Sequence, residues 1–390
     1  MLLGALTAFA PLSIDMYLPA LPLLEQVFRA TTAEVQRTLV TFLIGFALAQ
    51  LLYGPLADRF GRKRPLYGSL ALFVAASVAC GASNSVGWLT AFRLLQAIGA
   101  CGGQVMARAM VRDLFEPTET RRVFSMLFLV LGVSPIAAPL AGGYILLWFG
   151  WRAIFWLQAI IGLACLVGIH FRLPETMHPG TVHRLEPRKI LANYGTLARD
   201  RTFLGTALVC GFAASGMFGY IASAPFVFIN LYGVSPQHFG WLFGFIAVGI
   251  IGASQINGRA LHGIPAERVL RAAVAVQFVS GSALLAVTLA QAGGFAGLYV
   301  PLYAYVACVG FVYPCGAALA MATHARIAGF ASALLGTLQF GIAAISTILL
   351  GAIESASARP MAIVIAVCGA CGILIDLAFV GRRHNTSVSV

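Results

Sequence analysis

The sequence has few charged residues for its length. Of its 390 residues, only 10% are Asp, Glu, Lys or Arg, and 13 acids stand against 25 bases. A typical soluble domain carries about 25% charged residues, so this chain lacks the polar side chains that cover a water-exposed surface. With 60% hydrophobic residues and a mean hydropathy of +0.89, most of its surface must face lipid.

The apolar runs also lack the alternation of polar and apolar residues that marks a strand with one wet face. Runs of about 20 residues without alternation are typical of spanning helices, which satisfy their own backbone hydrogen bonds in lipid. We therefore predict an all-α membrane protein with 12 transmembrane helices. The expected spans are residues 2–24, 37–56, 66–83, 87–108, 123–148, 152–171, 202–225, 239–257, 269–290, 295–320, 330–352 and 360–380.

Clustered ligands for a metal or a catalytic centre are also missing. The eight cysteines all lie inside apolar runs, and the seven histidines are scattered. Cys368 and Cys371 have the spacing of a redox or metal pair, but no further ligand lies near them in the sequence, so we interpret them as packing residues. We expect no metal, no cofactor and no enzyme activity; a membrane enzyme or a channel remains the weaker alternative.

The bases are distributed unevenly between the two sides of the membrane. If the N-terminus is cytoplasmic, 20 of the 25 Lys and Arg residues lie in inner loops, four lie in outer loops and only Arg93 lies within a span. This bias predicts that both termini are cytoplasmic. The net charge of +12 then reflects topology, and we expect no nucleic acid partner.

The longest polar interruption, residues 172–201, divides the spans into six and six. We predict an N-terminal six-helix bundle (1–171), a cytoplasmic linker (172–201), a C-terminal six-helix bundle (202–380) and a cytoplasmic tail (381–390). Two such halves are typical of a transporter with its site between them. Within the linker, residues 189–197 fit either a helix on the membrane surface or a plain connection.

A charged turn separates the second and third spans. The turn, Gly54 to Pro65, holds two glycines, one acid and four bases: Gly54, Asp58, Arg59, Gly61, Arg62, Lys63 and Arg64. We expect it to act as a latch at the cytoplasmic gate, with its bases pairing with Asp113, Glu116 or Glu119 of the next inner loop. A simple topology anchor is the alternative, but it explains neither Asp58 nor the glycines.

Polar residues inside the spans are the candidates for proton coupling and substrate binding. Asp15 lies near mid-bilayer in the first span, where an acid is a functional hypothesis by default; a structural hydrogen bond to a neighbouring helix is the alternative. Arg93 shares a helix face with Gln96, and it either faces the bundle interior or extends toward the outer surface. Tyr17 is a candidate for lining a cavity.

The fifth span carries an unusual number of helix-weakening residues, Gly132, Pro135, Pro139, Gly142 and Gly143. In a membrane bundle such residues allow close backbone approach and a fixed bend. We expect this helix to form a rigid seal or pivot against another helix.

These patterns together resemble the major facilitator superfamily, in its twelve-helix drug/proton antiporter branch. Gly54-x-x-x-Asp58-Arg59-x-Gly61-Arg62-Lys63 is similar to the loop motif between helices 2 and 3. Arg93-x-x-Gln96 is similar to the helix 4 motif linked to proton coupling, although Ala97 stands where Gly is common. Residues 132–143 resemble the helix 5 antiporter motif, with Ser134-Pro135 in place of Gly-Pro.

Three further stretches, residues 14–22, 107–113 and 134–143, resemble the Bcr/CflA family, which exports bicyclomycin, chloramphenicol and similar drugs. The resemblance implies a multidrug efflux transporter with the major facilitator fold, multi-pass in the bacterial inner membrane and monomeric, which exchanges small apolar drugs for protons and confers antibiotic resistance. It also implies that Asp58 lies near the start of helix 11, at Gly329. A proton-coupled uptake or metabolite carrier on the same fold is the alternative.

Overall fold

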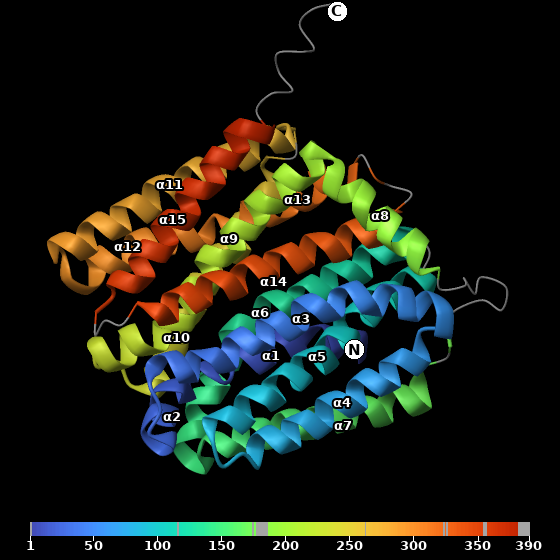
Figure 1. Cartoon of the computed structure of the whole chain (residues 1–390), viewed down its shortest axis with the longest axis horizontal. Coiled ribbons are helices and arrows are strands. Elements are labelled where there is room, and N and C mark those ends of the chain that lie inside the picture. Colours follow the sequence, from blue (N-terminus) through green and yellow to red (C-terminus); the bar gives the residue numbers. More distant parts are fainter. Residues whose placement is uncertain are drawn as a thin grey trace, which may run out of the picture. The chain divides into compact units, whose positions relative to one another are not determined.

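The computed structural model describes residues 2–114, 117–173, 175–176, 186–261, 263–322, 324, 327–353 and 357–380, and all regular structure in these ranges is helical (Figure 1). The first half contains α1 (Leu2–Asp15), η1 (Leu18–Ala20), α2 (Leu21–Phe28), α3 (Thr32–Phe60), α4 (Lys63–Gly81), α5 (Val86–Leu114), α6 (Pro117–Phe149) and α7 (Trp151–Arg172). The second half contains α8 (Pro187–Arg199), α9 (Arg201–Pro225), η2 (Phe226–Leu231), α10 (Pro236–Arg259), α11 (Ala266–Ala290), α12 (Gly294–Ala307), α13 (Val309–Ala322), α14 (Ala328–Ala352), α15 (Arg359–Ile375) and η4 (Asp376–Val380).

The prediction of an all-helical membrane protein is confirmed. Among the described residues, 11 helices are long and apolar enough to cross a membrane. α5 is not among these eleven: it has 29 residues, enough to cross a membrane, but it carries the polar residues Arg93 and Gln96 within its apolar stretch. The expected span 87–108 overlaps α5, and each of the other eleven expected spans overlaps one of the eleven candidates.

The chain forms two compact units. The first comprises Met1–Ile190 together with Phe228–Gly244, and the second comprises Leu191–Val227 together with Phe245–Val390. The first boundary falls inside the polar segment 172–201, and the short piece around the start of α10 is grouped with the first unit. The domain limits given above stay a prediction.

Within the first unit, short signals end one helix and begin the next. Thr31 and Glu34 form a capping box at the start of α3. Gly61 and Gly150 have φ angles of +83° and +79° and separate α3 from α4 and α6 from α7, a backbone conformation that glycine adopts without strain. As a result α4 packs lengthwise between α5 and α7 (Figure 1).

The first span is broken in the middle rather than continuous. α1 ends at Asp15, a short 3₁₀ segment follows, and α2 resumes at Leu21. Because Pro19 has no amide hydrogen, the carbonyl of Asp15 cannot receive the usual helical hydrogen bond from four residues ahead. The break therefore lies beside the one acid of this helix that sits deep in the span.

Candidate functional site

A buried polar network surrounds Arg93 in the first unit. The Arg93 side chain is 0% exposed, so it lies inside the bundle and does not extend toward the outer surface. Its Nη1 donates hydrogen bonds to the carbonyl oxygen of Ser13 and to Oε1 of Gln96, both at 2.8 Å. Arg93 on α5, which is also bonded to Gln96, is thus hydrogen-bonded to α1 two residues before the helix break.

Gln96 extends this network to two more helices. Its Nε2 donates to Oγ of Ser77 on α4 and to Oε1 of Gln158 on α7, both at 2.8 Å. Nε2 of Gln158 in turn donates to the carbonyl oxygen of Leu12 at 3.2 Å. Gln158 was not predicted as a site residue, although a lone amide within the apolar stretch of α7 is a signal that would have found it.

Aromatic faces enclose the guanidinium of Arg93. Its Cζ lies 4.8 Å from the ring centre of Tyr17 and 4.4 Å from that of Phe42, and the Tyr17 hydroxyl shares a 3.0 Å hydrogen bond with Thr38. Among the described atoms, Nε and Nη2 of Arg93 have no hydrogen-bond partner. Ring faces and carbonyl oxygens are the main partners of this buried cation, so a negative charge placed near it would interact with it strongly.

Asp15 is buried at the last position of α1, with 5% of its surface exposed. No ion pair in the described part of the chain joins it to Arg93. The structure therefore brings Arg93, Gln96 and Tyr17 together, and it connects them to Asp15 through the backbone of α1 rather than by a direct side-chain contact.

The glycines of α6 make the close approach that was expected of the fifth span. A Cβ added at Gly142 would overlap the carbonyl of Met16, directly after Asp15, and one added at Gly143 would lie 2.6 Å from the carbonyl oxygen of Pro236 on α10. Pro135 and Pro139 lie inside this helix. Only glycine fits at these two contacts, so α6 packs backbone to backbone against the break in the first span at Gly142 and against the start of α10 at Gly143.

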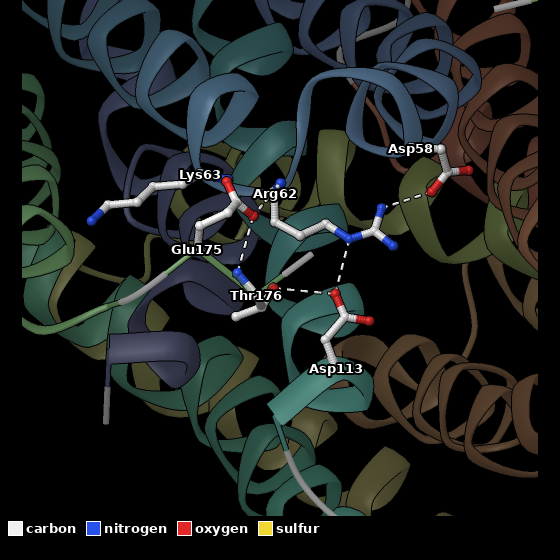
Figure 2. A network of polar contacts seen from close by, with 6 residues as sticks. All are labelled: Asp58, Arg62, Lys63, Asp113, Glu175 and Thr176. Atoms are coloured by element: carbon white, nitrogen blue, oxygen red, sulfur yellow. Dashed lines mark hydrogen bonds and ion pairs between the residues drawn. The ribbon is translucent and has the colours of Figure 1, made fainter. Parts of the chain in front are cut away.

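The charged turn builds a second polar network, at the end predicted to be cytoplasmic (Figure 2). Arg62 reaches two acids: its Nη1 lies 2.7 Å from Oδ1 of Asp58, and its Nε lies 3.0 Å from Oδ2 of Asp113. The same Oδ2 accepts a 3.1 Å hydrogen bond from Oγ1 of Thr176. Burial lowers the pKa of Arg62, but the hydrogen bonds and charges of the two carboxylates outweigh it, so the pKa is raised above its ordinary value.

The expected pairing of a base with Asp113 is thus present. Glu116 lies outside the described residues, and the side chain of Glu119 is not described. Arg59 is exposed and lies over the ring of Phe60, 5.2 Å from its centre, and Gly54 has open space where a Cβ would be. The proposed contact between Asp58 and the start of helix 11 stays a prediction.

An acid that follows α7 in the chain, Glu175, also belongs to this network. The Glu175 carboxylate accepts hydrogen bonds from the backbone amides of Arg62 at 2.9 Å and Lys63 at 3.1 Å, which caps the N-terminus of α4 (Figure 2). A Cβ at Gly61 would lie 2.7 Å from this carboxylate. Sequence reasoning missed Glu175, because the contact spans more than a hundred residues and has no local pattern.

Replacing this capping carboxylate gives a testable result. Glu175→Gln removes the negative charge at a helix N-terminus and should lower the free energy of unfolding by about 1–2 kcal/mol, seen as an earlier midpoint in SDS unfolding. The control is Glu186→Gln, which removes an exposed acid paired with Lys189 and should change the midpoint little. Equal effects of the two changes would contradict the capping role.

The second unit has its own ion pair beside the polar segment. Asp200 caps α9 by accepting from the amides of Thr202 at 2.8 Å and Phe203 at 3.4 Å, and its Oδ2 lies 2.7 Å from Nε2 of His324. Burial raises the pKa of Asp200, but the hydrogen bonds of His324 and the two amides outweigh it and hold the pKa below its ordinary value. This pair was not predicted from the sequence.

The segment predicted as either a surface helix or a plain linker contains a helix, α8. Leu197 on this helix is fully buried, and the ring of Tyr194 packs edge-on against Phe330 with ring centres 5.2 Å apart. α8 is therefore attached to the second unit by its apolar side.

Comparisons with known proteins agree with this architecture. The family model of the Major Facilitator Superfamily matches residues 3–347. The chain is 37% identical over 385 residues to the uncharacterized MFS-type transporter YdgK of Bacillus subtilis, covering 97% of this chain and 94% of that protein. It is 31% identical over 377 residues to the bicyclomycin resistance protein homolog of Haemophilus influenzae, again covering 97% and 94%.

A third relative is the multidrug resistance protein MdtL of Escherichia coli, 30% identical over 86% of this chain and 83% of that protein. Among solved structures, the xylose transporter XylE from E. coli in a partially occluded inward open conformation matches with a TM-score of 0.75 over 98% of this chain and 97% of that one, at 15% identity, a likeness of fold alone. The resemblance to the Bcr-like branch is confirmed by these relatives. The chain belongs to the Major Facilitator Superfamily, a family of multi-pass membrane transporters.

Proposed function

We propose that this protein is a proton-coupled exporter of small, mostly apolar drugs in the bacterial inner membrane, working by alternating access without any cofactor beyond the proton gradient. The observation that carries the proposal is the position of Asp15 at the break of the first span. α6 packs against the next residue through Gly142, and the Arg93 network holds the carbonyls of Leu12 and Ser13. The name of the bicyclomycin resistance relative supports drugs as the cargo class.

In this mechanism Asp15 carries the proton. When Asp15 takes up a proton from the outside, its charge disappears, the site binds the drug more weakly and the drug leaves. Reopening toward the cytoplasm releases the proton and restores the charged site. The protonation state of Asp15 changes the electric field at the end of α1. Arg93 is hydrogen-bonded to Ser13 at this end, so the change alters the network that joins α1 to α4, α5 and α7.

The remaining predicted residues have supporting roles. The antiporter helix resists a leak by leaving no room between backbones at Gly142 and Gly143. The ion pairs of Arg62 with Asp58 and Asp113 hold the cytoplasmic ends of the first unit together and change when the inner gate opens. Tyr17 supplies a ring that faces Arg93 inside the same network.

Transport in inverted membrane vesicles tests this proposal. Adding chloramphenicol or bicyclomycin to vesicles with an acidic interior should release protons from the lumen and draw drug inward, the direction that corresponds to export from cells. Drug movement without proton release would remove the coupling. Accumulation in the opposite direction would instead favour the proton-coupled uptake carrier on the same fold.

A further inference from the structure

A basic and aromatic surface patch lies where the start of α4 meets the end of α7. We call Lys63, Arg64, Tyr67, His170 and Phe171 the inner-leaflet patch. Two contacts join its two helices: Nζ of Lys63 donates to the carbonyl oxygen of His170 at 3.5 Å, and the Tyr67 hydroxyl lies 3.3 Å from Nδ1 of His170. Within α4, Lys63 Nζ lies 5.7 Å from the Tyr67 ring centre.

Among the described residues, no ion pair involves the bases of this patch. Cations in the first turn of a helix oppose its dipole, and the Glu175 carboxylate offsets this by accepting from the backbone amides of Arg62 and Lys63. The acids Asp58 and Asp113 are engaged by Arg62. In the described part of the chain neither Lys63 nor Arg64 forms an ion pair, and Figure 2 shows the Lys63 side chain extending away from the acidic network.

The side chains of the inner-leaflet patch are exposed or half-buried at the surface of the protein. Arg64 and His170 are exposed, and the Phe171 side chain is 79% exposed beside the exposed Arg172. These residues lie at the end of the spans that the distribution of bases places in the cytoplasm. A bare aromatic ring next to cations at this depth faces the glycerol and headgroup region of the inner leaflet, where anionic lipids concentrate.

We propose that the inner-leaflet patch binds the headgroup phosphate of an anionic phospholipid. Lys63 and Arg64 contact the phosphate, and Phe171 packs against the glycerol and the upper acyl chain. A zwitterionic lipid carries its own cation and gains less from the two bases. The basic helix α8 is a weaker candidate for this role, because Lys189 already pairs with Glu186 at 2.9 Å.

Native mass spectrometry of the full-length protein in detergent tests this site. The probes are phosphatidylglycerol and phosphatidylcholine with identical acyl chains. The wild-type protein should prefer phosphatidylglycerol, and Lys63→Gln/Arg64→Gln should weaken its binding by on the order of thirtyfold, since each base near a membrane surface contributes about a fivefold effect. Binding of phosphatidylcholine should not change.

The matched control is Arg29→Gln/Arg37→Gln, which removes two exposed bases from the opposite end of the spans and should keep the preference. If the first double variant does not fold, Arg64→Glu alone is tested, because the exposed side chain of Arg64 does not belong to the polar network of Arg62. This variant should also lose the preference for phosphatidylglycerol. Equal binding of both lipids by the wild-type protein would overturn the proposal. So would an unchanged preference in the patch variants, or the same loss in the control.

Discussion

Asp15→Asn should abolish proton-coupled drug export while leaving the protein folded. Asn has nearly the same shape as Asp but cannot release a proton, so the site would stay in its neutral form throughout the cycle. In vesicles, drug-driven proton movement should fall by at least about tenfold. Drug exchange between two equal pools without a gradient should persist at raised drug concentration, because the neutral site binds the drug more weakly. That split follows because exchange needs the binding site but not the change in protonation.

Two control variants sharpen this experiment. Asp15→Glu keeps a titratable group at the break and should retain part of the coupled transport. Glu34→Gln removes an acid from the capping box at the start of α3, outside the helices that flank the break, and should lower stability slightly without changing coupling. If Asp15→Asn still moved protons with drug at the wild-type rate, Asp15 would have no coupling role.

Among glycine-to-alanine changes in this chain, Gly142→Ala should cause the largest loss of stability and transport. Its Cβ would overlap the carbonyl of Met16, and because both partners are backbone, neither can turn away. Overpacking of this kind costs about 1–3 kcal/mol or more, and it would displace the helix break next to Asp15. We expect a lower midpoint in SDS unfolding and a loss of transport in the molecules that still fold.

Gly252→Ala is the matched control for this prediction. Gly252 also lies inside a helix, α10, but a Cβ there meets no atom within 4 Å. Replacing glycine with alanine in an open helix position usually stabilises the helix by about 0.5–1 kcal/mol. The two changes should therefore shift the unfolding midpoint in opposite directions, and a shift of the same sign in both would contradict the backbone contact.

Features that depend on neighbouring residues could be predicted from the sequence. Spans follow from runs of apolar residues, so α7 was expected at 152–171 and lies at Trp151–Arg172. Arg93 and Gln96 are three residues apart on a helix, so they share a face and their hydrogen bond is no surprise. Pro11, Pro19 and Pro22 can bend the first span, but their positions alone do not tell that the helix ends at Asp15.

Contacts between distant residues could not be predicted in the same way. Gln158 reaches Gln96 across 62 positions, and Glu175 reaches Arg62 across 113. Many polar residues occur near helix ends, and no local rule tells which one will meet which terminus once the helices pack. The sequence indicated which residue types carry charge inside the membrane, whereas the three-dimensional packing decides that Arg93 contacts a backbone carbonyl and not Asp15.

The position of Glu175 in the chain also has a consequence for biogenesis. A chain is made from its N-terminus, and its domains generally fold in that order during synthesis. The amides of Arg62 and Lys63 must therefore wait for their capping acid until α7 has entered the membrane and the next residues have left the ribosome. The N-terminus of α4 lacks this cap until Glu175 has been made, and it gains the cap before most of the second unit has been synthesised.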